Sequence, residues 1–221
     1  MTFAVGIMCG EGVVIAADTL TELLPNDETA VPGTGKFVPG GTKIRETARG
    51  FVTGYGVGQL LSVVDDLILT LPVIEPDVIR LAVTELKASY RAPRHILDKT
   101  GWIYSYEGGY STNPALGAMV RSLDVGVALF QEDGSVSLKP TPAYACWPHG
   151  IPDALYTMVY DYLAQFGRSG DRIDKVSEVI LEVFRALQVP GINVSNDLYI
   201  ATHRPIQRRS VEHVVIGRSP G

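Results

Sequence analysis

The 221-residue sequence is poor in cysteine and in charge, and both shortages exclude classes of protein. Its two cysteines, Cys9 and Cys146, cannot form a disulfide framework, and neither belongs to a Cys-x-x-Cys pair. Charged residues make up 19% against 46% hydrophobic ones, a balance that excludes intrinsic disorder. The net charge of −5 argues against non-specific binding of nucleic acid. We therefore expect a folded cytoplasmic protein with reduced, buried thiols and no nucleic-acid partner.

Long apolar runs and clustered metal ligands are also missing. No stretch of about 18 apolar residues occurs, so we expect no membrane-spanning helix and no membrane partner. The start, MTFAVG, has no positive region before an apolar stretch and is not predicted to be a signal peptide. The four histidines lack metal-ligand spacing, and the glycines from Gly54 to Gly58 lack a phosphate-loop pattern. We expect no metal and no cofactor.

The distribution of apolar residues predicts strands, two helices, strands, two helices and strands, in that order. The segment between residues 22 and 42 is rich in proline and glycine and is predicted to be a long loop, and residues 99–118 are predicted to be an ordered loop or insertion. The predicted strands are 2–9, 13–17, 50–53, 125–130, 136–138, 197–202 and 211–216. The predicted helices are 59–71, 76–90, 152–166 and 172–187.

This order of elements places pairs of helices between antiparallel strands, which does not favour a doubly wound parallel sheet. It favours an α+β fold, a four-layer αββα sandwich in which two antiparallel sheets pack face to face with a helix pair outside each. Such a sandwich needs one domain, residues 1–221. The high apolar content also suggests that copies of the chain cover part of its surface.

Thr2 opens the first predicted strand, directly after Met1. Removal of Met1 would give Thr2 a free α-amino group close to its own hydroxyl. The unperturbed pKa of such an amine, about 7.7–8.0, suits a general base at neutral pH. Nucleophile and base would then belong to one residue.

Residues 2–19, TFAVGIMCGEGVVIAADT, resemble the start of the proteasome β-subunit family of N-terminal nucleophile hydrolases, which includes simpler bacterial relatives. In that family a threonine nucleophile opens the first strand, a glycine turn follows, and the second strand ends in Ala-Ala-Asp. Thr2 and Asp18 have this spacing without a gap. The Lys-Ile pair at 43–44 matches the family's next element after a longer loop, and residues 51–54 match a short strand that ends in glycine before the first helix.

The resemblance implies four catalytic residues, Thr2, Asp18, Lys43 and Gly54. The Lys43 cation would lower the cost of deprotonating the Thr2 hydroxyl, and Asp18 would hold that cation and balance its charge. The backbone N–H of Gly54 would donate to the oxyanion of the tetrahedral intermediate. Without the resemblance, Asp18 would be a strand-end carboxylate and Lys43 a surface charge, and Lys36 is a weaker candidate for the lysine.

Two supporting elements of the family differ in this sequence. The family carries a Ser-Gly-Ser-like segment at the start of its third helix, whereas residues 146–151 read CWPHGI. It also has an Arg-Asp pair and a following serine after its fourth helix, whereas residues 187–195 contain no aspartate. His149 could replace a missing polar group, or it could be an ordinary residue at a helix entry.

We therefore expect a threonine-type N-terminal nucleophile hydrolase, an endopeptidase in a self-compartmentalised homo-oligomer. Its expected partners are copies of itself and a peptide or unfolded-protein substrate, and the resemblance implies an ATP-driven unfoldase. Two alternatives stay open. One is a catalytically inactive assembly subunit that retains Met1, and the other is a small-molecule amidohydrolase on the same fold.

Overall fold

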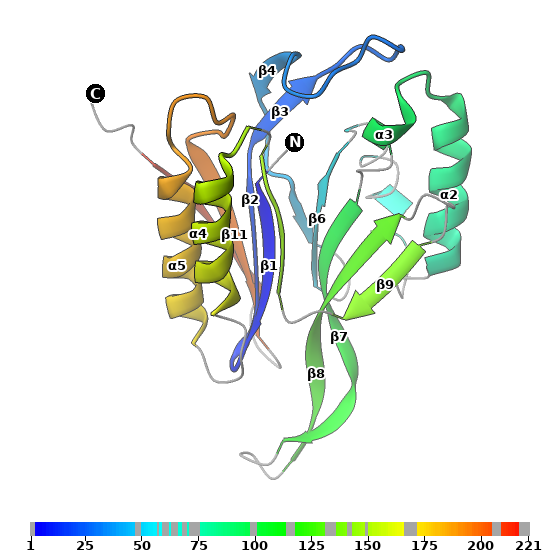
Figure 1. Ribbon diagram of the computed structural model, residues 1–221. Helices are drawn as coiled ribbons and strands as arrows, with labels where there is room; N and C mark the ends of the chain where they lie inside the picture. The colour runs from blue at the N-terminus through cyan, green and yellow to red at the C-terminus, as the bar shows by residue number, and fades with distance from the viewer. Residues whose placement is uncertain are drawn as a thin grey trace.

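The computed structural model describes most of the chain, and the account below concerns those residues. They are 3–46, 50–56, 58, 62, 66–67, 70, 76–97, 101–113, 118–130, 136–140, 143–148, 150–165, 172–204 and 209–216. Figure 1 shows two sheets side by side, with α4 and α5 next to the first and α2 on the side of the second. The fold is α+β and its sheets are antiparallel.

The first sheet holds the chain's first two strands at its centre. Its order is β10 (Ala143–Cys146), β1 (Ala4–Cys9), β2 (Gly12–Asp18), β11 (Asp197–His203) and β12 (Arg209–Val215). The continuous apolar run of β2 is explained by burial on both faces, because every residue of this strand is buried. The predicted hairpin at the start of the chain and the two predicted C-terminal strands are confirmed.

The second sheet has the order β5 (Ile44–Glu46), β6 (Phe51–Tyr55), β7 (Gly101–Asn113), β8 (Ala118–Phe130) and β9 (Val136–Pro140). The predicted hairpin near residues 125–138 is confirmed as β8 and β9. The prediction of a loop over 99–118 is wrong for most of that segment, because β7 pairs with both β6 and β8. Its tyrosines and Trp102 are residues that favour strands, but the glycines among them led to the prediction of a loop.

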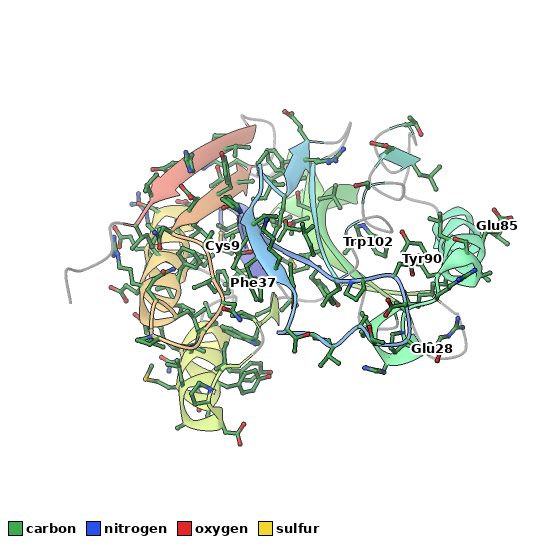
Figure 2. All side chains as sticks on the ribbon, turned by 90° about the horizontal axis from the view of Figure 1, so that it is seen from above. Cys9, Glu28, Phe37, Glu85, Tyr90 and Trp102 are labelled. Atoms are coloured by element: carbon green, nitrogen blue, oxygen red, sulfur yellow. The ribbon has the colours of Figure 1, made fainter. Side chains whose placement is uncertain are left out.

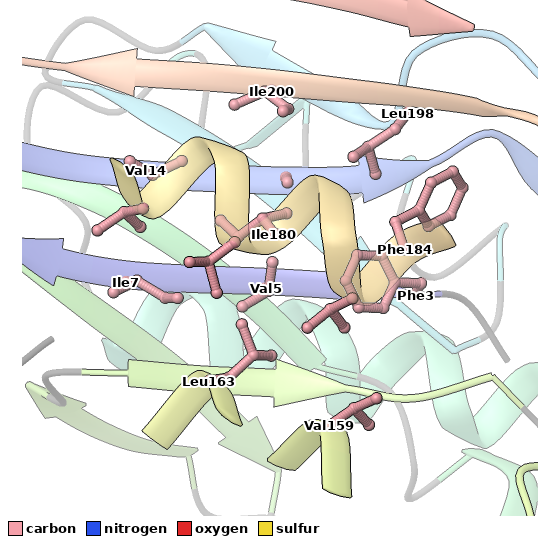
Figure 3. Packing of buried hydrophobic residues seen from close by; sticks show 14 of the residues in the cluster. Phe3, Val5, Ile7, Val14, Val159, Leu163, Ile180, Phe184, Leu198 and Ile200 are labelled. Carbon is pink, nitrogen blue, oxygen red and sulfur yellow. The ribbon is translucent and has the colours of Figure 1, made fainter. Parts of the chain in front are cut away.

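Helices α4 (Asp153–Ala164) and α5 (Ile173–Ala186) cover the outer face of the first sheet, as Figure 3 shows for the residues of this core. Both helices confirm the predicted spans 152–166 and 172–187. The buried face of α5 repeats at helical spacing, with its side chains packed on β1, β2 and β11. This core includes Phe3, Val5, Ile7, Val14, Leu163, Ile180, Val183, Phe184, Leu198 and Ile200.

A second core lies between the two sheets. It takes alternate residues of β1 and β2, such as Ala4, Val13 and Ile15, against Phe51 and Ile103 of the second sheet. Since neighbouring residues of a strand point to opposite faces, β2 supplies side chains to both cores at once. The two sheets are therefore packed face to face through apolar side chains.

The described helices on the side of the second sheet are α2 (Pro76–Ser89) and the short α3 (Arg94–Leu97), of which α2 was predicted. The predicted helix 59–71 lies mostly outside the described residues, although positions 62, 66, 67 and 70 are helical. Among the described residues no helix combines the length and apolar character needed to cross a membrane.

The proline- and glycine-rich segment after β2 contains a second hairpin rather than only a loop. Strands β3 (Leu20–Leu23) and β4 (Lys36–Pro39) pair antiparallel, which corrects the prediction of an unstructured 22–42 segment. The Glu22 carboxylate accepts hydrogen bonds from the backbone N–H groups of Gly33 at 2.7 Å and Gly35 at 2.8 Å, so the loop folds back on its own strand. Figure 2 looks down on this hairpin, with Phe37 on β4 and Glu28 in the loop.

Candidate active site

Asp18 ends β2 and is completely buried, at 0% exposure. Its backbone N–H donates to the carbonyl of Phe3 at 3.0 Å, so the end of β2 lies beside the start of β1. The antiparallel register of the hairpin, with Ala4 opposite Ala17, produces this closeness. Thr2 and Met1 lie outside the described residues, which begin at Phe3.

Lys43 directly precedes β5, and its side chain extends to Asp18. Its Nζ lies 2.9 Å from Asp18 Oδ1 and also donates to the carbonyl of Leu20. The Lys43 side chain is 17% exposed, whereas the carboxylate is inaccessible to solvent. A buried carboxylate is costly unless it is paired and hydrogen-bonded, and this ion pair meets that need. The structure thus brings together two of the four predicted site residues, and the paired lysine is Lys43 and not the exposed Lys36 of β4.

Gly54 lies in the buried strand β6, where it pairs with Trp102 of β7. On the other side of β6, Thr53 pairs with Ile44, the residue that follows Lys43. Gly54 and Lys43 are therefore each one residue from this paired position.

Ser195 is a residue of this region that the sequence prediction missed. It lies in the connection between α5 and β11, and its backbone N–H donates to Asp18 Oδ2 at 3.4 Å. Its hydroxyl accepts from the backbone N–H of Thr19 at 3.0 Å. The serine contacts residues 176 and 177 positions earlier in the chain, a separation that no local sequence pattern encodes.

Cys146 at the end of β10 is opposite Ala4 in the register of the first sheet. Burial raises the pKa of its thiol to about 12, and the charge of Asp18 contributes in the same direction while Lys43 opposes it. The thiol is therefore protonated at neutral pH, and the thiolate is the form that acts as a nucleophile. This excludes Cys146 as a thiolate nucleophile. His149, the suggested substitute for a family serine, lies outside the described residues.

Comparisons with known proteins agree with this arrangement at the level of the fold. No protein-family model matches the chain, and no curated protein matches its sequence. Among solved structures, the chain is similar to the Anbu (Gly-1) mutant from Hyphomicrobium sp. strain MC1, with a TM-score of 0.61 and 15% identity over 96% of this chain and 87% of that one.

A second structure of Anbu from the same strain gives a TM-score of 0.58 at 15% identity, over 95% of this chain and 87% of that one. Anbu is a bacterial proteasome-like protein. The fold is proteasome-like. The similarity spans both sheets and the helices, so the chain shares an architecture with Anbu, while the assignment of its site residues rests on the contacts of Asp18 and Lys43.

Proposed function

We propose that the protein is a threonine-type N-terminal nucleophile hydrolase, most simply a peptidase, built as one αββα domain of residues 1–221. The observation that carries this proposal is the buried ion pair of Asp18 and Lys43 beside the carbonyl of Phe3. Phe3 directly follows Thr2 in the sequence, so the backbone of Asp18 contacts the residue next to the proposed nucleophile. The proteasome-like fold supports the same reaction class.

In the proposed reaction, Thr2 acts after Met1 has been removed. Its Oγ attacks the carbonyl carbon of a peptide bond while its own α-amine takes the hydroxyl proton. The Lys43 cation stabilises the developing alkoxide, Asp18 holds that cation, and the backbone N–H of Gly54 donates to the oxyanion. The C–N bond then breaks, the amine leaves with the transferred proton, and water hydrolyses the acyl-enzyme.

We further propose that the chain assembles with copies of itself. Several large apolar side chains of α4 are exposed, including Tyr156, Met158 and Tyr160. Exposed apolar groups gathered on one helix are typical of protein–protein contacts. An ATP-driven unfoldase and an unfolded-protein substrate belong to this proposal through the proteasome-like fold alone.

The test is hydrolysis of a mixture of fluorogenic peptide amides by the purified full-length protein and by Thr2→Ala. The matched control is Thr157→Ala, because Thr157 is an exposed residue of α4 whose hydroxyl bonds only a carbonyl of its own helix in the described contacts. We expect activity in the wild type and in Thr157→Ala, and none in Thr2→Ala. Equal activity in wild type and Thr2→Ala would overturn the assignment of the nucleophile.

A second candidate function is a non-catalytic assembly subunit with Met1 retained. The observation in its favour is the lack of the Ser-Gly-Ser and Arg-Asp elements in residues 146–151 and 187–195. This alternative predicts no hydrolysis by any variant and an intact mass that includes Met1. The same experiment therefore separates the two functions.

A further inference from the structure

A groove lies between helices α4 and α5, which run side by side outside the first sheet (Figure 1). Its volume is about 520 Å³. Met158 and Val159 of α4 and Val183 and Ala186 of α5 supply its apolar lining. None of these residues belongs to the candidate active site, so the groove is a separate feature of the molecule.

Met158 extends the apolar lining of the groove to the molecular surface. Its side chain is 56% exposed, whereas Val159 and Val183 are each 1% exposed. A methionine side chain is unbranched and flexible, so it adapts its shape to different apolar partners. The groove therefore offers a ligand a buried apolar base and one adaptable apolar wall.

Two carboxylates border this apolar lining, one from each helix. Asp161 of α4 and Glu182 of α5 are exposed, and neither forms an ion pair with a residue in the described part of the chain. The Tyr162 hydroxyl donates to Glu182 Oε2 at 2.6 Å, which fixes this carboxylate beside the groove. The same hydrogen bond raises the pKa of Tyr162, so the phenol keeps the proton that it donates.

The charge of both helices has the same sign as these carboxylates. Helix α4 contains two aspartates and no basic residue. Helix α5 contains three acidic residues and two basic ones, Lys175 and Arg185, neither of which lines the groove. An apolar ligand with positive charges on its flanks matches this lining, whereas a ligand with negative charges would be repelled.

The groove lies on a different flank of α4 from the tyrosines proposed for self-assembly. Tyr156 and Tyr160 stack on each other with their ring centroids 5.9 Å apart. At about 3.6 residues per turn, these two tyrosines lie on one side of the buried Val159, and Met158 and Tyr162 lie on the other. A contact between copies through the tyrosines therefore leaves the groove accessible.

We propose that the groove between α4 and α5 binds a basic amphipathic helix of a partner protein. The apolar side chains of that helix fill the groove beside Met158, and its Lys or Arg side chains pair with Asp161 and Glu182. An amphipathic helix that lays its apolar face in an apolar groove is a recurring mode of peptide recognition, and the carboxylates select a basic partner. This binding goes beyond the proposed hydrolase function and does not depend on it.

The test is fluorescence polarisation of a labelled synthetic peptide, titrated with the full-length protein. The peptide is an amphipathic helix of Leu and Lys, about 14 residues or four turns long, and its matched control has Glu in place of every Lys. We expect saturable binding of the Lys peptide and none of the Glu peptide. Wild type and Thr2→Ala should bind the Lys peptide equally, because the groove does not include the proposed nucleophile.

Charge reversal in the groove shows whether the carboxylates select the peptide. Asp161→Lys and Glu182→Lys should each weaken binding of the Lys peptide at least about 10-fold, because like charges repel across an interface. The matched control is Glu28→Lys, which makes the same change in net charge in the loop between β3 and β4 (Figure 2). It should stay within about twofold of the wild type, since solution ions screen distant charges. Equal losses in all three folded variants would overturn the inference.

A second variant tests the apolar part of the groove, and crosslinking locates the peptide. Met158→Ser should weaken binding by about 3- to 10-fold, because an exposed apolar contact is lost without a change of charge. A benzophenone group on one Leu of the peptide should crosslink to α4 or α5, as fragmentation of the product would show. No saturable binding, or crosslinks confined to other elements, would overturn the inference.

Analytical ultracentrifugation separates this partner from a second copy of the chain. If the Lys peptide does not bind and Asp161→Lys lowers the mass of the assembly, a second copy occupies the groove and the inference fails. If the wild type binds the peptide in the groove but hydrolyses no peptide amide, the hydrolase proposal fails and the inference stands.

Discussion

Buried polar contacts bridge the two sheets at both ends of the sandwich, and the two bridges differ in kind. At one end, Lys43 beside the second sheet meets Asp18 of the first. At the other end, Ser105 of β7 lies 3.1 Å from Nδ1 of His203 in β11. Asp18 pairs with Leu198 on β11, so the bridges are five residues apart along that strand, about 17 Å at the rise of a β-strand.

The first bridge is a charged pair whose lysine retains contact with solvent, whereas both residues of the second bridge are buried. Ser105 is 1% and His203 2% exposed, and the Phe51 ring meets the His203 ring edge-on at 6.2 Å. The Ser105 hydroxyl also accepts from the backbone N–H of Phe51 at 3.0 Å. Of the two bridges, only the first is in contact with solvent, through Lys43. Under the proposed function, the polar link at one end would support chemistry, and the link at the other end supports sheet packing.

The largest expected effect comes from removing the cation of the first bridge. Lys43→Ala should lower peptide hydrolysis by about 1,000-fold or more, because it removes the charge proposed to stabilise the Thr2 alkoxide and takes from Asp18 the cation of its ion pair. The measurement is the rate of hydrolysis at neutral pH, with Lys36→Ala on the exposed strand β4 as the control. Similar losses in both variants would show that the ion pair has no special part in the reaction.

The next largest expected effect is on the pH dependence of stability, at the end of the sandwich that holds Asp18 and Lys43. Because burial raises the pKa of the Cys146 thiol from 9.0 to about 12, the fold retains a proton that the unfolded chain releases above pH 9. Stability should therefore be lost as the pH rises from 9 towards 12, by about 3 kcal/mol at pH 11.

Urea unfolding at pH 8 and pH 11 measures this loss in the wild type and in Cys146→Ala. The variant cannot release that proton, so its free energy of unfolding should fall by about 3 kcal/mol less between the two pH values. An equal fall in both proteins would show that the thiol ionises in the folded state as easily as in the unfolded chain.

At the second bridge, between Ser105 and His203, we expect a substitution to affect stability alone. Ser105→Ala leaves the Phe51 N–H and the His203 ring without this hydroxyl, which should lower the free energy of unfolding by about 2 kcal/mol. Peptide hydrolysis by the folded variant should stay within about twofold of the wild type. Urea unfolding provides the measurement, with the exposed Ser89→Ala of α2 as control. A large loss of activity in the folded Ser105 variant would break the distinction between the two bridges.

The smallest effect lies between the bridges, on β6. The Thr53 hydroxyl is buried and has no hydrogen-bond partner within the described part of the chain. Thr53→Val has the same shape without the hydroxyl and should raise the free energy of unfolding by about 1 kcal/mol. A decrease in thermal stability would show that the hydroxyl has a partner in the folded protein, such as a buried water.

Local patterns predicted the first hairpin, the helices α2, α4 and α5, and the C-terminal strands, because the helices have a regular apolar period and the strands are apolar runs between turns. The β3–β4 hairpin was missed because its pairing depends on Glu22 holding Gly33 and Gly35, a tertiary feature in a segment of turn-forming residues. Strand β10 was also missed, since its four residues are too short to show an apolar period.

For the site, the family resemblance pointed to Asp18 and Lys43, which lie 25 residues apart in the sequence and 2.9 Å apart in space. Ser195 was not among the predicted site residues, although it ends the segment 187–195 that was matched to the family's serine-containing element. Its contact with Asp18 depends on how the connection after α5 meets the end of β2, which only the folded chain shows.

The most direct test of the central claim is mass spectrometry of the native protein after reaction with an electrophile directed at an N-terminal threonine. We expect loss of Met1 and one adduct per chain, which fragmentation places on Thr2 and which Thr2→Ala lacks. An intact Met1 with no adduct on the assembled protein, or an adduct on any other residue, would contradict it.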